Sequence, residues 1–179
     1  MNRAVSFAAA IATVAALGTG SGVWAASSAA AAPHGMIAKC TTSDVAVWLN
    51  LSESHTAKGS IYLPLEFTNI SHDTCYLYAY PGVSAIDANG RQLGDAAVRS
   101  GRRAGRIVNV VPGATAHATL RYVDSVTMAR GCKPERANYL KVYPEGQMTA
   151  GYTFFPVPSC TATGKKWAYL TIGSVQRGV

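Results

Sequence analysis

The chain has 179 residues, of which 49% are hydrophobic and 14% are charged, and its formal net charge is +7. This composition excludes a disordered polyelectrolyte and supplies enough apolar surface for the core of one domain. The excess of basic residues favours anionic partners but does not decide the fold.

The N-terminus has the pattern of a secretory signal peptide. Arg3 precedes an apolar run from Ala4 to Leu17, and small residues lead to Val23-Trp24-Ala25. An uncleaved membrane anchor is the alternative, but the run is shorter than the about 20 residues that span a bilayer. We therefore expect residues 1–25 to be a signal peptide that is removed near Ala25-Ala26.

The segment 26–38 is Ala-rich and of low complexity, so we expect a flexible leader ahead of a single domain at 39–179. No cysteine lies near the predicted cleavage point, so a lipoprotein anchor is not expected. With the signal peptide removed, no transmembrane anchor would remain, and the mature protein would be secreted or extracellular.

Short runs with period-2 alternation predict strands along the rest of the chain. The runs are Val45–Leu51, Leu63–Thr68, Cys75–Tyr80, Val83–Asp87, Arg106–Val111, Ala116–Tyr122, Tyr139–Tyr143, Tyr152–Val157 and Trp167–Gly173. Turn signals separate them at regular intervals. The pattern predicts an all-β fold, an Ig-like two-sheet antiparallel β-sandwich of seven to nine strands.

Polar residues and turn residues predict the connections between these strands. Ser52–Gly59 is predicted to be a polar loop, and Asn69–Asp73 a hairpin connection. Pro81-Gly82 predicts a turn, and Asn89-Gly90 is a hairpin signal. Val123–Asn138 is predicted to be an irregular segment held by a cysteine.

Four cysteines remain after export, namely Cys40, Cys75, Cys132 and Cys160. An even number in an oxidising compartment predicts two disulfides, and three pairings are possible. We favour Cys40–Cys75 and Cys132–Cys160, because each would join a strand edge to a neighbour close in sequence. A zinc or redox site is disfavoured, since there is no C-x-x-C and the histidines are scattered, so we expect no metal and no cofactor.

Two surface features are candidate binding sites. Tyr76, Tyr78 and Tyr80 alternate with apolar residues, so they would form a stripe able to stack on sugar rings or peptide planes. The alternative is that this stripe serves cross-strand packing alone.

The second feature is a cluster of arginines without an intervening acid. Arg99, Arg102, Arg103 and Arg106 are separated by small residues and are a candidate docking site for a polyanion such as an anionic cell-wall polymer. The alternative is a solvated loop that keeps a basic protein in solution. Nucleic acid is not an expected partner of an exported protein.

No motif indicates catalysis. A nucleophile elbow is absent, and the adjacent Ser54 and His55 would point to opposite sides of a strand. We therefore expect no catalytic residues and no enzymatic activity.

The stretch from Leu65 to Gly94 resembles the secreted bacterial family called domain of unknown function 4232, and the likeness extends over residues 39–176. The matching residues are Phe67, Thr68, Asn69, Cys75, Leu77, Tyr80, Pro81, Gly82, Val83, Asp87, Gly90, Leu93 and Gly94, followed by Val111–Tyr122, Cys132 and Leu140–Gly146. Ala79 stands where Gly is usual and Glu145 where a second Pro is common, and we expect neither departure to matter. The resemblance implies a secreted Ig-like β-sandwich, common in actinobacteria, with no assigned activity.

These observations favour a non-enzymatic binding module of the cell envelope or extracellular space. The alternative is a secreted enzyme inhibitor or host-directed effector that acts through an exposed loop at Val126–Asn138. Its partner would then be another extracellular protein. A structural role without any ligand also fits the sequence.

Overall fold

The structure is a computed structural model that describes residues 35–101, 106–124 and 129–178. The predicted signal peptide, 1–25, and residues 26–34 of the leader lie outside the described residues. Residues from Met36 onward form one unit by their internal contacts. Within the described ranges, no helix combines the length and the apolar character needed to cross a membrane.

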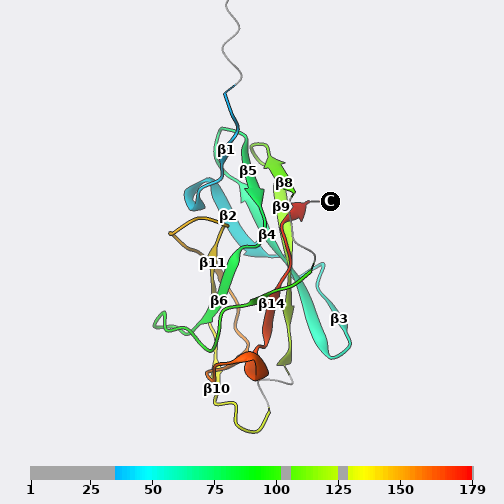
Figure 1. Ribbon diagram of the computed structural model, residues 1–179, viewed down its shortest axis with the longest axis vertical. Coiled ribbons are helices and arrows are strands. Elements are labelled where there is room, and N and C mark those ends of the chain that lie inside the picture. Colours follow the sequence, from blue (N-terminus) through cyan, green and yellow to red (C-terminus); the bar gives the residue numbers. More distant parts are fainter. Residues whose placement is uncertain (1–34, 102–105, 125–128, 179) are drawn as a thin grey trace, which may run out of the picture. The chain divides into compact units, whose positions relative to one another are not determined.

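Short strands make up most of the regular structure (Figure 1). They are β1 Ala38–Lys39, β2 Val45–Leu49, β3 His55–Ala57, β4 Ser60–Asn69, β5 Cys75–Tyr78, β6 Gly82–Ile86, β7 Val98–Arg99, β8 Ile107–Val110, β9 Thr115–Tyr122, β10 Pro134–Arg136, β11 Tyr139–Tyr143, β12 Gly151–Phe154, β13 Pro158–Cys160, β14 Leu170–Ile172 and β15 Gln176–Arg177. Two 3-10 turns, η1 Thr42–Asp44 and η2 Lys165–Trp167, complete the described elements.

The largest sheet has the order β2-β4-β9-β14-β7, with β3 added to β4 and β15 added to β9. Its centre is the antiparallel pair β4–β9, in which Leu65 faces Ala118 and Phe67 faces Ala116. These four side chains are fully buried. The alternation of β9, and of Leu63, Leu65 and Phe67 within β4, therefore places one face of this sheet on the core and the other outward.

Three smaller sheets have the orders β1-β5-β8, β12-β11-β6 and β10-β13. Leu77 of β5, Val110 of β8 and Leu140 of β11 belong to the same hydrophobic core as Leu65 and Phe67 of β4. The large sheet and the smaller sheets thus bury their apolar faces against one another, as the layers of a sandwich do. The all-β fold expected from the sequence is confirmed.

The strands differ from the expectation in number and direction. Fifteen strands occur among the described residues, because several pairings involve only two or three residues. Two pairings are parallel, β1 with β5 and β14 with β7, and the expected purely antiparallel arrangement is wrong at these two places. Alternation of apolar and polar residues can be recognised only over about four residues or more, so it could not reveal strands of two or three residues.

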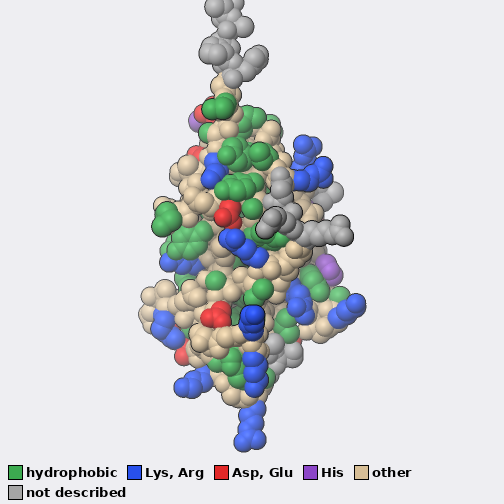
Figure 2. Space-filling model, viewed as in Figure 1, with side chains coloured by type: hydrophobic (Ala, Val, Ile, Leu, Met, Phe, Trp, Pro, Cys, Tyr) green, Lys and Arg blue, Asp and Glu red, His purple; other side chains and the backbone are tan. Residues whose placement is uncertain are grey.

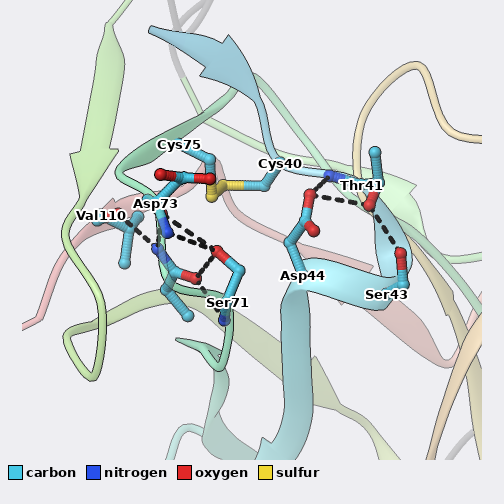
Figure 3. Close-up of a disulfide and its surroundings, with 9 residues drawn as sticks. Cys40, Thr41, Ser43, Asp44, Ser71, Asp73, Cys75 and Val110 are labelled. Carbon is cyan, nitrogen blue, oxygen red and sulfur yellow. Dashed lines mark hydrogen bonds between the residues drawn. A yellow bond between two sulfur atoms is a disulfide. The ribbon is translucent and has the colours of Figure 1, made fainter. Parts of the chain in front are cut away.

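The predicted hairpin at Asn69–Asp73 is wrong, because β4 and β5 belong to different sheets and this segment crosses between them. The buried Asn69 side chain organises the crossover. Figure 3 labels its partners there, Ser71, Asp73 and Val110. Its amide nitrogen donates to the carbonyls of Asp73 and Val110, both at 2.8 Å. Its oxygen accepts from the Ser71 backbone N–H at 2.9 Å and from the Ser71 hydroxyl at 2.7 Å.

The predicted loop at Ser52–Gly59 also needs correction, since it contains β3, which pairs with the start of β4. Lys58 and Gly59 both have positive φ, 49° and 66°, as the two central residues of a tight hairpin turn require. Lysine is uncommon at such a position, so Lys58-Gly59 is not recognised as a hairpin turn from the sequence.

The disulfides pair as favoured from the sequence, Cys40 with Cys75 and Cys132 with Cys160. Cys40 directly follows β1, and Ala38 lies opposite Cys75 in the parallel β1–β5 pair. In the second case Cys160 lies opposite Pro134 in the β10–β13 pair. Each bond therefore fastens a short strand pair whose few backbone hydrogen bonds would hold it weakly.

We expect that the double change Cys40→Ala and Cys75→Ala lowers the free energy of unfolding by about 3.5–4 kcal/mol, from the entropy of an open loop of this size. The sequence separation of the two cysteines is 35 residues. Urea unfolding of the exported protein measures the change. Non-reducing peptide mapping of the unmodified protein should recover only the two pairs named above, and crossed pairs would contradict the strand arrangement.

Ala79 lies directly after β5 and has φ of 53°, a left-handed conformation that is strained for a residue with a Cβ atom. Its carbonyl accepts a hydrogen bond from the Val175 N–H at 2.8 Å, which holds the backbone in place. Ala79 replaces the glycine that is usual in the family, and the sequence comparison predicted that this replacement has no effect. The structure shows that it carries backbone strain.

We expect Ala79→Gly to stabilise the protein by up to about 1 kcal/mol, because relief of the left-handed strain exceeds the entropy that glycine adds to the unfolded chain. The matched control is Ala88→Gly at an exposed position whose φ is not positive. That change should destabilise by about 0.4–1 kcal/mol. Thermal unfolding of both variants tests the sign, and a loss of stability in both would show that Ala79 is unstrained.

Candidate functional site

The outward face of the sheet β1-β5-β8 combines tyrosines with a lysine. We call it the tyrosine–lysine face, and it consists of Lys39, Tyr76, Tyr78, Ile107 and Asn109. In the sheet register Lys39 and Asn109 flank Tyr76, and Ile107 lies opposite Tyr78. Figure 2 shows hydrophobic side chains gathered over β1 and β5, with a cationic group among them.

The two tyrosines of this face are half-buried and adjacent, with ring centroids 6.0 Å apart and planes tilted by 53°. The Lys39 ammonium donates to the Tyr78 hydroxyl at 3.2 Å and lies 4.8 Å from the ring centroid. The inward neighbours Cys75 and Leu77 are buried. The face therefore offers aromatic surface, hydroxyls and an ammonium group side by side.

Tyr80 is separated from this pair, because the left-handed Ala79 ends the alternation of β5 at Tyr78. The Tyr80 hydroxyl donates to the carbonyl of Gly101 at 3.3 Å, and the Arg99 guanidinium lies 5.9 Å from its ring centroid. The predicted stripe of three tyrosines thus consists of two in register and one that contacts the segment 99–101.

The arginine cluster is only partly described. Arg99 is exposed and forms an ion pair with Glu145 at 2.9 Å, so its charge already has a partner. Arg106 is exposed next to β8. Arg102 and Arg103 lie outside the described residues. Polyanion docking at these four arginines stays a prediction.

A second outward face was missed by the sequence interpretation. It lies on β11 and β12 and consists of Tyr139, Lys141, Tyr143, Tyr152 and Phe154, which we call the β11–β12 face. Lys141 is opposite Tyr152, and Tyr139 is opposite Phe154 with ring centroids 5.9 Å apart. The alternation of Tyr139 to Tyr143 could have revealed it, since Leu140 and Val142 between them are apolar and buried.

A buried carboxyl was also missed. Glu66 lies on the outward side of β4, opposite Trp48 of β2 and His117 of β9, yet only 6% of it is exposed. Burial raises the pKa of Glu66, and this effect exceeds the opposing influence of the Asn50 hydrogen bond and the attraction of His117. No sequence pattern distinguishes this glutamate from an exposed one.

The residues considered for catalysis do not converge. The Ser54 hydroxyl donates to the carbonyl of Leu51 at 2.7 Å, whereas the His55 ring stacks on Tyr62 with centroids 5.0 Å apart. In the part of the chain that the structure describes, no group of three or more His, Cys, Asp or Glu residues is arranged to hold a metal ion.

The loop proposed for the inhibitor alternative, Val126–Asn138, is described from residue 129 onward. Its middle forms β10, which pairs with β13, and Cys132 ties it to Cys160. The Glu135 carboxylate accepts from Arg91, which also pairs with Asp87. The described part is therefore a segment with a short strand at 134–136 that is fastened by a disulfide, and residues 126–128 lie outside the described residues.

The fold and these faces define a class of protein: an all-β domain with two disulfides and outward-facing aromatic side chains. The family model described as Domain of unknown function (DUF4232) matches residues 40–176, and the chain belongs to this family. No curated protein and no solved structure matches the chain.

We expect Glu66→Gln to stabilise the protein at neutral pH. A folded-state pKa above the ordinary value of 4.5 means that the ionised form of Glu66 is disfavoured by folding, so its contribution to stability is fully present below pH 4.5 and is lost as the pH rises through the folded pKa. The advantage of the glutamine should therefore shrink as the pH falls through the raised pKa of Glu66 and should be gone below pH 4.5. Thermal unfolding from pH 3 to pH 8 checks this, and a difference that does not depend on pH would contradict it.

Proposed function

We propose that this protein is a secreted, non-enzymatic binding module whose ligand rests on the tyrosine–lysine face. The observation that carries the proposal is the adjacent pair of half-exposed tyrosines, 6.0 Å apart, with the Lys39 ammonium held at the hydroxyl of Tyr78. Secretion is supported by the N-terminal pattern and by two disulfides, which persist in oxidising compartments.

The chemistry of this face favours a ligand with flat apolar surface and a negative group. Tyrosine rings stack on sugar rings or peptide planes and add a hydroxyl that can donate or accept. Lys39 offers a positive charge, in keeping with a protein of formal net charge +7. An anionic cell-wall polymer meets both requirements and is the partner that we propose.

The absence of catalytic activity is part of the same proposal. It is supported by the separation of Ser54 from His55 and by the position of His117, whose nearest acidic neighbour in register is the buried Glu66. Such an arrangement lacks an accessible nucleophile beside a base.

Tyr76→Ala and Tyr78→Ala should each reduce co-sedimentation with purified bacterial cell wall by roughly two- to tenfold, the effect of losing one stacked ring. Tyr62→Ala is the matched control, because Tyr62 lies on the outward side of the other layer and stacks on His55. Melting temperatures of all three variants separate binding from folding. If both face variants melt earlier but sediment like the control, the tyrosines serve packing alone and the proposal is wrong.

A further inference from the structure

A tyrosine–lysine contact occurs twice among the residues that the structure describes. On the β11–β12 face the Lys141 ammonium lies 5.4 Å from the centroid of the Tyr143 ring. The neighbouring Tyr143 side chain raises the pKa of Lys141, whose ammonium group is charged at neutral pH in any case. Both faces therefore present a similar unit, an ammonium group close to a tyrosine ring, 4.8 Å from the centroid in the first and 5.4 Å in the second.

The second unit is surrounded by exposed aromatic side chains. Tyr139, Tyr152 and Phe154 are 41%, 57% and 62% exposed, and all three lie on the same side of β11 and β12 as Lys141. Exposed aromatic clusters of this kind usually mark contact surfaces, because their burial by a ligand is favourable.

The two units are neighbours on the surface. Tyr143 ends β11, and the turn that follows brings Gly146 against the first unit, where an added Cβ would lie 2.8 Å from the Lys39 nitrogen and 3.4 Å from the Tyr78 hydroxyl. Three Cα–Cα steps separate Tyr143 from Gly146, so their Cα atoms are at most about 11 Å apart.

The charge between the units suits an anion as well. Glu145 is the acid of the connecting turn, and its carboxylate is paired with Arg99 at 2.9 Å. A negatively charged ligand that passes from one unit to the other therefore meets a neutralised carboxylate.

We infer that the ligand is a linear polysaccharide with a carboxylate on its rings, and that it spans both faces with rings on the tyrosines and carboxylates at Lys39 and Lys141. This inference rests on the proposed function and extends it, because one face alone would suit a short ligand equally well. Two similar tyrosine–lysine units side by side suit a polymer whose rings and carboxylates also repeat. Simultaneous contact with both units raises the affinity through effective concentration.

The experiment measures the affinity of the full mature chain for oligogalacturonates of two to twelve rings by isothermal calorimetry. The dodecamer should bind at least tenfold more tightly than the dimer. Methyl-esterified chains of equal length are the neutral control and should bind weakly. Lys141→Met should remove the dependence on length and leave dimer binding at the first face in place.

Lys133→Met is the matched control, since it removes the same charge at an exposed position on neither face. Equal effects of Lys141→Met and Lys133→Met, an affinity independent of length, or equal binding of the esterified chains would each overturn the inference. Tighter binding of oligodeoxythymidylate, with the same dependence on Lys141, would assign the faces to nucleic acid instead.

Cell-wall sedimentation separates this inference from the proposed function. If Tyr76→Ala and Tyr78→Ala reduce retention on cell wall while Lys141→Met does not, the binding module stands and the spanning ligand is wrong. If Lys141→Met reduces retention on cell wall but no oligogalacturonate binds, the carboxylated polysaccharide is wrong. If none of these changes affects retention, both proposals fail.

Discussion

The arrangement of the sheets depends on the hydrogen bonds of the Asn69 side-chain amide. It lies where the chain leaves β4 for the opposite layer, and both its donors and both lone pairs of its oxygen are satisfied by Asp73, Val110 and Ser71. A residue without these four groups would leave buried polar atoms unpaired, at about 1–3 kcal/mol each. The bond to Val110 fixes the end of β8, and the Cys40–Cys75 disulfide next to the crossover fixes the start of β5. All residues of the tyrosine–lysine face except Lys39 lie on these two strands, so their positions depend on a network that contains no residue of the face itself.

Much of the fold could be predicted from alternation, and what escaped prediction has a common cause. The middle of β4 and most of β9 were predicted with their core-facing residues, because Leu63–Thr68 and Ala116–Tyr122 alternate between apolar and polar side chains. The segment Asn69–Asp73 has the polar composition of a loop, which predicts a hairpin between two successive strands. Polar composition does not tell which sheet the chain enters next, so the crossover could not be predicted. The parallel pairings of β1 and β7 are two residues long and join segments far apart in sequence. Such elements depend on the tertiary fold, which local patterns do not encode.

In the candidate faces too, features within a regular strand could be predicted, whereas contacts between distant segments could not. Tyr76 and Tyr78 were placed on one face correctly, since they lie within a regular strand. Tyr80 was not, because it lies beyond the end of β5, after the left-handed residue Ala79 that interrupts the alternation. The contact of Lys39 with Tyr78 depends on the parallel pairing of β1, and the ion pair of Arg99 with Glu145 joins residues 46 positions apart. Sequence reasoning can therefore name the residues of a sheet face, whereas the partners that charge or neutralise the face come from elsewhere in the chain.

Some backbone edges of the sheets are occupied, and this has a consequence for how the protein meets other molecules. The segment 149–151 lies against η1 and β2, because the Thr42 hydroxyl of η1 donates to the carbonyl of Thr149 at 2.6 Å and a Cβ added at Gly151 would lie 3.2 Å from the Val47 side chain of β2. The N–H groups of Leu93 and Ala97 occupy carbonyls of β6, and the terminal strand β7 has only two residues. At these places a foreign strand cannot extend the sheets. Molecules that meet the protein there must therefore recognise its side chains.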